Sequence, residues 1–183
     1  MPLLSGLRHA LFALCVTITP VAHAGSPMTL AAFSNPETTG DWRFFTDGVM
    51  GGVSHGQAVI DGGALRMTGT VSTENNGGFI QARLADISVP QDITQITARV
   101  RGDGQTYFLH IRTTRTRLPW QYFQAPFTAP LEWTDIAIPL TDFKPSGALL
   151  GATPRADQIT SIALVAYGRD HIADVSLATL GAQ

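Results

Sequence analysis

Hydrophobic and polar residues alternate along most of the chain after about its first two dozen positions. In residues 107–112, for example, Tyr107, Leu109 and Ile111 fall on one side and the intervening residues fall on the other. This period of two is typical of a half-buried β-strand, and no stretch shows a clean helical period over three turns. The segments predicted as strands are 42–45, 57–60, 64–70, 79–84, 96–101, 107–112, 120–125, 133–140, 159–167 and 173–180.

The segments between these strands carry residues typical of turns. Asp, Asn and Gly, which tolerate a positive φ, gather at 61–63, 75–78 and 103–104. Residues 142–157 contain two prolines and are predicted as a long loop with at most one helical turn. Nine or ten short strands separated by such turns indicate an all-β fold, a sandwich or a barrel.

The first residues follow a different pattern. Arg8 precedes a short apolar run over 10–16, and Ala22-His23-Ala24 then supplies the small residues of a cleavage site. We therefore predict a signal peptide over 1–24, cleaved after Ala24, and a periplasmic or secreted mature protein. The apolar run is too short to span a bilayer, so we do not expect an integral membrane protein. One β-sandwich domain is predicted over 25–183, with its core at about 30–180.

Composition narrows the classes of function. The chain has 183 residues, of which 44% are hydrophobic and 14% charged, and its net charge is −2. Such a chain folds, and the absence of a basic excess disfavours nucleic-acid binding. Cys15, the single cysteine, lies in the predicted signal peptide, and a lipoprotein anchor there is disfavoured because Leu14 precedes it. The mature chain therefore has no thiol for a disulfide or a nucleophile.

Few residues are spaced for metal binding or catalysis. The three His of the mature chain are far apart in sequence and lack the spacing of metal ligands, so we predict no metal site. A structural calcium remains an alternative, since scattered loop carboxylates can bind it. Its candidate ligands are Asp47, Asp103, Asp170 and Asp174.

Two segments suggest binding. Five arginines within 99–117 form either a basic patch for an acidic partner or a solvated edge, and the edge is favoured. Aromatic and amide residues then alternate over 120–127, which indicates either a sugar-binding platform or a core strand. The candidate ligand-facing residues are Arg112, Trp120, Tyr122 and Gln124.

Two glycine-rich segments carry a family resemblance. They are Asp47-Gly-Val-Met-Gly-Gly-Val-Ser54, after Trp42, and Asn75-Asn-Gly-Gly-Phe79. With the strands that follow, they resemble the complex I intermediate-associated protein family over about residues 30–180. The resemblance implies a galactose-binding-like jelly-roll β-sandwich without catalytic residues or a cofactor. It also implies that one corner of the sandwich is built by Asp47, Gly48, Met50, Gly51, Gly52, Ser54, Asn76, Gly77, Gly78 and Phe79.

Known members of that family assist assembly of respiratory NADH:ubiquinone oxidoreductase and are not enzymes. The first hypothesis is therefore a non-enzymatic, assembly-factor-like module that engages a protein partner in the cell envelope. The alternative is a carbohydrate-binding module that takes a glycan. An enzyme acting on a small ligand in a jelly-roll pocket is a third hypothesis, which requires convergent titratable groups.

Overall fold

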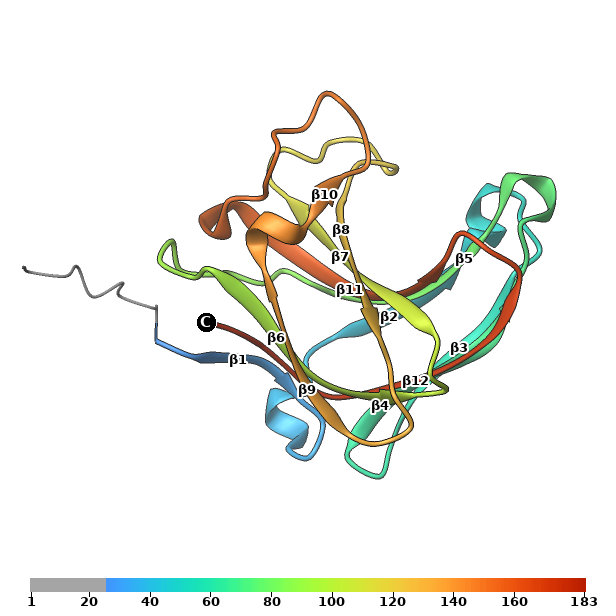
Figure 1. Cartoon of the computed structure of the whole chain (residues 1–183), viewed down its shortest axis with the longest axis horizontal. Helices are drawn as coiled ribbons and strands as arrows, with labels where there is room; N and C mark the ends of the chain where they lie inside the picture. The colour runs from blue at the N-terminus through green and yellow to red at the C-terminus, as the bar shows by residue number, and fades with distance from the viewer. Residues whose placement is uncertain (1–25) are drawn as a thin grey trace, which may run out of the picture.

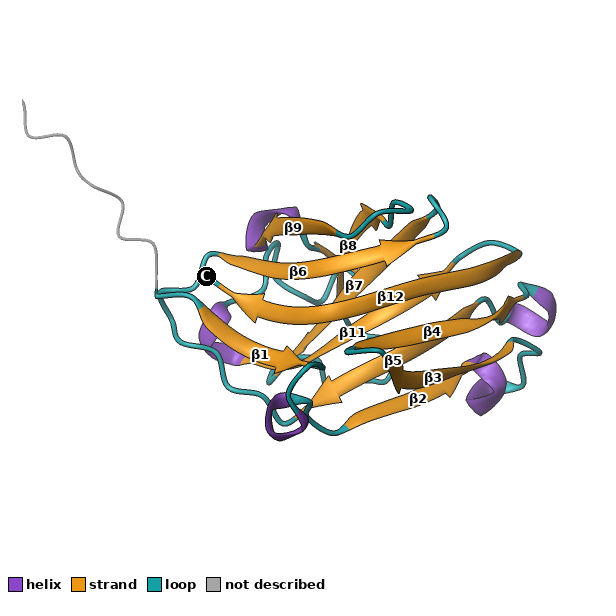
Figure 2. Ribbon diagram, turned by 90° about the horizontal axis from the view of Figure 1, so that it is seen from below, coloured by secondary structure: helices purple, strands orange, loops and turns teal. Residues whose placement is uncertain are grey.

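Two antiparallel β-sheets of six strands each lie face to face in the computed structural model, which describes residues 26–183 (Figures 1 and 2). Sheet A has the order β3 (His55–Asp61), β4 (Ala64–Val71), β12 (His171–Ala182), β6 (Gln95–Gly102) and β9 (Thr134–Pro139), with β1 (Met28–Ala32) also paired to β12. Sheet B has the order β10 (Lys144–Pro145), β8 (Phe123–Thr128), β7 (Thr106–Thr113), β11 (Ile159–Tyr167), β5 (Phe79–Ala85) and β2 (Trp42–Thr46). The prediction of an all-β sandwich is confirmed.

Only short 3₁₀ helices interrupt the strands of this part of the chain. They are η1 (Pro36–Thr38), η2 (Asp47–Met50), η3 (Glu74–Asn76), η4 (Leu140–Asp142) and η5 (Ala156–Gln158). Between residues 26 and 183 no helix has the length and apolar character needed to cross a bilayer. The predicted signal peptide and its cleavage site lie outside the described residues.

The core lies between the sheets and is filled by the alternate residues that the sequence pattern selected. In β7, Tyr107, Leu109 and Ile111 are almost completely buried. In β11, which lies beside it, Ile162 and Leu164 are equally inaccessible. A strand buries alternate side chains on one face, so each sheet contributes one apolar face to the sandwich.

Three strand predictions need correction. The strand expected over 120–125 begins only at Phe123, because the preceding loop is held open by Arg112, whose guanidinium donates to the carbonyls of Thr116, Leu118 and Pro119. The strand β1 was missed, and it pairs with β12 alone. The two-residue strand β10 was also missed, since so short a segment carries no periodic signal.

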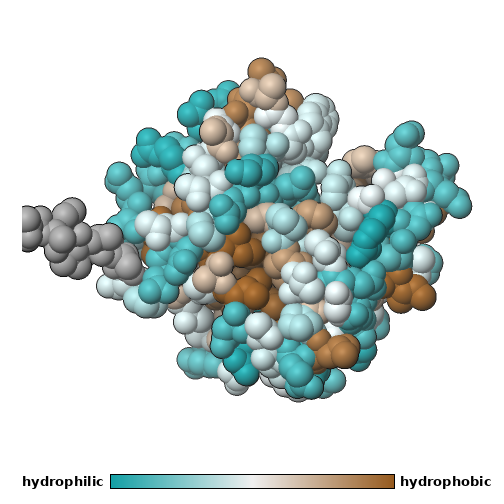
Figure 3. All heavy atoms as spheres, in the orientation of Figure 1, coloured by the Kyte–Doolittle hydropathy of each residue, from teal (hydrophilic) through white to brown (hydrophobic). Residues whose placement is uncertain are grey.

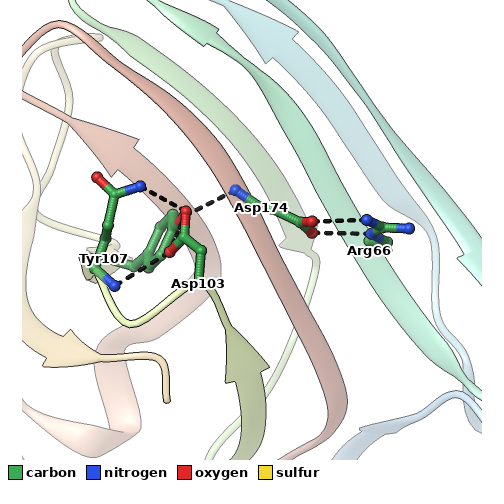
Figure 4. Close-up of polar contacts among 5 residues, drawn as sticks. Arg66, Asp103, Tyr107 and Asp174 are labelled. Atoms are coloured by element: carbon green, nitrogen blue, oxygen red, sulfur yellow. Dashed lines mark hydrogen bonds and ion pairs between the residues drawn. The ribbon is translucent and has the colours of Figure 1, made fainter. Parts of the chain in front are cut away.

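A polar network crosses between the sheets at one end of the core (Figure 4). The hydroxyl of Tyr107 donates to the carboxylate of Asp103 at 3.0 Å and accepts the backbone N–H of Asp174 at 2.8 Å. The carboxylate of Asp174 in turn forms a bidentate pair with Arg66 at 2.9 and 2.6 Å. Tyr107 belongs to sheet B and Asp174 to sheet A, so this hydroxyl joins the two layers. Burial raises the pKa of Tyr107, which keeps its donor proton in place.

Candidate functional site

The carboxylate of Asp47 joins two glycine-rich loops at one end of the sandwich. Asp47 is fully buried, and it accepts the Ser54 backbone N–H at 3.0 Å and the Ser54 hydroxyl at 2.5 Å. From the second loop, the backbone N–H groups of Gly78 and Phe79 donate to its Oδ2 at 2.5 and 3.2 Å. Figure 1 accordingly shows η2 and η3 side by side. We call this region the signature corner, residues 46–54 and 74–79.

The electrostatics and the glycines of the signature corner follow from this carboxylate. Burial alone would raise the pKa of Asp47, but the four hydrogen bonds outweigh burial and hold the pKa below its ordinary value. A Cβ on Gly52 or Gly77 would overlap the carboxyl group. Gly51 and Gly78 have φ of +89° and +123°, a region that side chains disfavour. The glycine pattern therefore serves backbone geometry around one buried charge.

The other residues of the corner point outward or support the turn. The Gly48 N–H donates to the Thr46 hydroxyl at 3.1 Å, which caps η2. Asn76 is exposed and has a φ of +57°. The side chains of Val49 and Met50 are 72% and 65% exposed. The hydrogen bonds to Asp47 thus hold the backbone of the signature corner, while the side chains of Val49 and Met50 face solvent.

Sheet B has a second face, turned away from sheet A, which we call the outer face. Figure 1 shows that the sheet curves on this side, and the outline in Figure 3 is indented between the signature corner and the loops around β10. Cross-strand pairing aligns side chains of five strands there. The two central rows are Gln124–His110–Ala163–Arg83 and Pro126–Phe108–Val165–Gln81–Phe45.

Aromatic rings cover much of the outer face. The rings of His110 and Tyr122 are stacked, with centroids 4.1 Å apart and planes 8° apart. Two further pairs meet edge-on, Phe45–Phe79 at 6.3 Å and Phe108–Tyr167 at 6.0 Å. Burial and the neighbouring Tyr167 phenol raise the pKa of Tyr122, so the hydroxyl remains protonated. Such rings combine an apolar surface with a polar edge, which suits ligands that are themselves amphipathic.

Unpaired polar atoms lie beneath these rings. His110 is only 7% exposed although it points away from the core. Burial, and secondarily the charge of Arg83, lower the pKa of His110 to about 3, so the imidazole is neutral at physiological pH. Within residues 26–183, neither His110 Nε2 nor Gln124 Oε1 has a hydrogen-bond partner. A third such atom among the described residues, His171 Nε2, lies on β12 of sheet A. Unsatisfied buried polar atoms are uncommon, and two of the three are paired neighbours at the centre of the outer face.

Two partly buried arginines flank this centre. The Arg83 guanidinium lies 4.6 Å from the centroid of the Phe45 ring and donates to Gln81 Oε1 at 3.3 Å. Arg112 is occupied by the three carbonyls of the loop before β8. Burial lowers the pKa of both groups, and for Arg83 the charge of Arg112 adds to the effect. No ion pair in the described chain involves either residue.

Of the four residues predicted as ligand-facing, the structure places Arg112, Tyr122 and Gln124 on or beside the outer face. Trp120 instead lies in the loop before β8 and is 66% exposed. Sequence reasoning missed the outward residues of the neighbouring strands. The alternation in each strand could have found them, and they are Phe45, Gln81, Arg83, Phe108, His110 and Tyr167. Phe79, predicted as part of the signature loops, also lies on this face.

The fold separates the other two candidate clusters. Within the five-arginine group, Arg99 and Arg101 lie on sheet A and Arg112 lies on sheet B, so they form no single patch. Each of the four carboxylates proposed for calcium is bonded to protein donors, and the carboxylate of Asp174 is directed at Arg66. Among residues 26–183 no group of three or more potential ligand residues could hold a metal ion. A depression lined by Arg66, Arg101 and Asp174 lies on sheet A, away from the outer face of sheet B.

Comparison with known proteins identifies the family. Residues 31–175 match the sequence model of complex I intermediate-associated protein 30. The chain belongs to this family. Because the match includes both loops of the signature corner, the buried Asp47 and its partners belong to the matched region. None of the curated protein sequences matches the chain.

Solved structures similar to this family member include several carbohydrate-binding modules. The family 11 module of cellulase Lic26A-Cel5E of Clostridium thermocellum has a TM-score of 0.68 and 13% identity, covering 87% of this chain and 95% of the module. The same type of module in complex with a β-1,3-1,4-mixed-linked tetrasaccharide has a TM-score of 0.66 and 14% identity, covering 85% and 94%. A family 29 module has a TM-score of 0.54 and 9% identity, and the match covers 86% of this chain and 87% of the module. At these identities the likeness confirms the galactose-binding-like fold.

Proposed function

We propose that this protein is a non-enzymatic binding module that holds a glycan against the outer face of sheet B. The observation that carries the proposal is the alignment of aromatic rings with amide and guanidinium groups on that face. Phe45, Phe108 and Tyr167 supply apolar ring surface, and Gln81 and Gln124 lie beside them in the same rows. Sugar rings have apolar faces and hydroxyl edges, so they match both kinds of group.

The structural neighbours support a glycan as the ligand. The family 11 and family 29 modules are carbohydrate-binding proteins, and one of them was solved with a β-1,3-1,4-mixed-linked tetrasaccharide. The two buried polar atoms without protein partners, His110 Nε2 and Gln124 Oε1, are groups that ordered water or ligand hydroxyls could satisfy. This ligand class is the carbohydrate-binding alternative predicted from the sequence.

Calorimetry against a panel of soluble glycans tests this function. Tyr167→Ala removes a 36%-exposed ring from the outer face and should weaken binding roughly 2- to 10-fold, the size of one lost aromatic contact. The matched control is Trp133→Ala, whose ring packs against Arg101 on sheet A. Equal weakening by both variants, or no binding to any glycan in the panel, would reject the outer face as a glycan site.

A protein partner is the second candidate function, and the signature corner favours it. Val49, Met50 and Val53 are 72%, 65% and 44% exposed on loops that Asp47 holds rigid. Exposed apolar groups on an ordered loop are typical of contact surfaces between proteins. Since the family is named for association with a complex I intermediate, respiratory complex assembly is the process in which such a partner would be sought.

Crosslinking in intact cells separates this candidate from the first. A photoreactive residue in place of Met50 should give a discrete adduct, whereas the same residue at Ile60, 51% exposed on β3, should not. Adducts of equal yield at both positions would contradict a specific contact. We also propose export to the envelope, and the test is whether the mature protein begins at Gly25, as cleavage after Ala24 requires.

A further inference from the structure

We infer that the outer face of sheet B selects acidic glycans, with Arg83 binding a carboxylate or sulfate group on the sugar chain. This inference rests on the proposed glycan function and adds the charge of the ligand to it. It follows from three features of the face: its cations, the incomplete bonding of Arg83, and the absence of a carboxylate partner for Arg83 among the described residues.

Outward positions on the strands of sheet B carry positive charge without acidic residues. Alternation and register place four cationic side chains there, and every other outward strand residue is apolar, aromatic or uncharged. The four cations are Arg43, Arg83, Arg112 and Lys144. A like-charged surface with low-dielectric walls attracts a ligand of opposite charge.

Three outward arginines of the strands have a carboxylate partner, and one of them, Arg43 on β2 of sheet B, is paired with Asp41 at 3.3 Å. Arg66 is paired with Asp174 at 2.6 Å, and Arg99 with Asp135 at 2.9 Å, although these side chains are largely exposed to water. Arg83 is less exposed, and within residues 26–183 it has no carboxylate partner. A partly buried cation without a counter-charge is a costly arrangement unless a ligand supplies one.

Arg83 is also incompletely bonded and firmly positioned. A guanidinium has five N–H donors in a planar fork. In the described chain one of them reaches an acceptor, Gln81 Oε1, at 3.3 Å. The ring of Phe45 lies 4.6 Å below the guanidinium carbon and orients its plane. The remaining donors are free to take a carboxylate or sulfate in a bidentate manner.

Arg112 contributes charge rather than direct contact. Its guanidinium donates to three loop carbonyls, so its hydrogen bonds are already committed to holding residues 116–119. It lies on β7, two strands from Arg83, which corresponds to roughly 10 Å across the sheet. Register places the small residues Ser161 and Ala163 of β11 between the two charged strands, so an acidic sugar chain that crosses β11 there passes between the arginines.

Affinity measurements with matched polymers test the inference on the mature protein. Polygalacturonate is compared with its methyl ester, and carrageenan with agarose, because within each pair the sugar backbone is similar and the acidic group differs. We expect at least tenfold tighter binding to one acidic member, and which pair shows it distinguishes carboxylate from sulfate. Polyglutamate, an anion without sugar rings, should bind no better than the neutral polymers.

Variants assign the preference to Arg83. Arg83→Gln should weaken binding to the acidic polymer about 10- to 100-fold, the range for a hydrogen bond to a charged group. Arg83→Lys keeps the positive charge but lacks the planar guanidinium, so it should lose less affinity for the acidic polymer than Arg83→Gln does. Arg99→Gln, on β6 of sheet A, removes the same charge and should have little effect. Thermal unfolding of each variant verifies that it is folded, and Arg83→Lys keeps the test available if Arg83→Gln unfolds.

The possible outcomes distinguish the acidic preference from glycan binding itself. Equal binding of neutral and acidic members would overturn the acidic preference and leave the glycan site standing. Equal loss in Arg83→Gln and Arg99→Gln, or binding to polyglutamate as tight as to the acidic glycan, would show non-specific attraction and also overturn the inference. Failure of every glycan to bind would remove both the inference and the proposed function.

Discussion

Replacing Asp47 by Asn tests whether one buried carboxylate holds the signature corner. The substitution keeps the shape of the side chain, but it removes the charge and replaces one acceptor oxygen by an amide donor. In the native protein four donors converge on the carboxylate, two from Ser54 and one each from Gly78 and Phe79. The amide of the variant would face at least one of these donors with a donor of its own.

The size of the effect follows from these contacts. A hydrogen bond to a charged group contributes roughly 1.5–3 kcal/mol, and bonds that share one acceptor group are not additive. We expect Asp47→Asn to lower the free energy of unfolding by about 3–5 kcal/mol, the range for breaking a buried charged contact. In a domain of this size that corresponds to a fall in Tm of about 6–20 °C.

Urea unfolding followed by circular dichroism provides the measurement. Asp135→Asn is the control, because its carboxylate is 76% exposed in a surface ion pair with Arg99 and should cost less than about 1 kcal/mol. The pKa of Asp47 lies below its ordinary value of 3.8, so its stabilisation is complete above about that pH and is lost as pH falls through the folded pKa. The difference between the wild type and Asp47→Asn should therefore be constant from pH 7 to about 5 and shrink below about 4. A loss at pH 7 no larger than that of the control would refute the reasoning.

Three further substitutions have expected outcomes. Gly52→Ala places a Cβ against the Asp47 carboxyl group and should cost about 1–3 kcal/mol in urea unfolding, whereas Gly147→Ala, in open space, should change stability by less than about 0.5 kcal/mol; similar values for the two would contradict the packing argument. Tyr107→Phe removes the hydroxyl that joins the sheets and should cost about 1–3 kcal/mol, and a loss below about 0.5 would show that the network is dispensable. Because the pKa of His110 is about 3 in the folded protein, the free energy of unfolding of the wild type should fall as pH drops from 6.5 toward 3. His110→Gln should reduce that fall, and an equal fall in both proteins would contradict the burial of a neutral imidazole.

Much of the fold was predictable because its signals are local. The alternation of Tyr107, Leu109 and Ile111 is visible within six residues, and those side chains fill the core between the sheets. Where the local signal was weak the prediction was wrong, as at Trp120, where side-chain bonds from Arg112 hold a loop instead of a strand. The short strand β10 carries no period at all and was missed.

The candidate site was less accessible to such reasoning. Alternation put His110 and Arg112 on the face opposite Tyr107, but it did not show that His110 would be buried there beneath Tyr122. The sequence also grouped five arginines that the fold divides between two sheets. Arg83 lies outside that group, and nothing in its local sequence distinguishes it.

The sequence by itself determined which side of each strand is apolar, and it carried the two glycine-rich segments that identify the family. Both properties depend on residues that are close together along the chain. Side chains alternate between the faces of a strand with a period of two, and glycine is needed where the backbone adopts a conformation that other residues disfavour. Only the tertiary structure decided which outward residues meet. Arg83, Ala163 and His110 share one row because β11 pairs with both β5 and β7, strands from distant parts of the chain. That register is set by the summed packing of the whole core, so the ligand-facing surface emerges only after the sheets have formed.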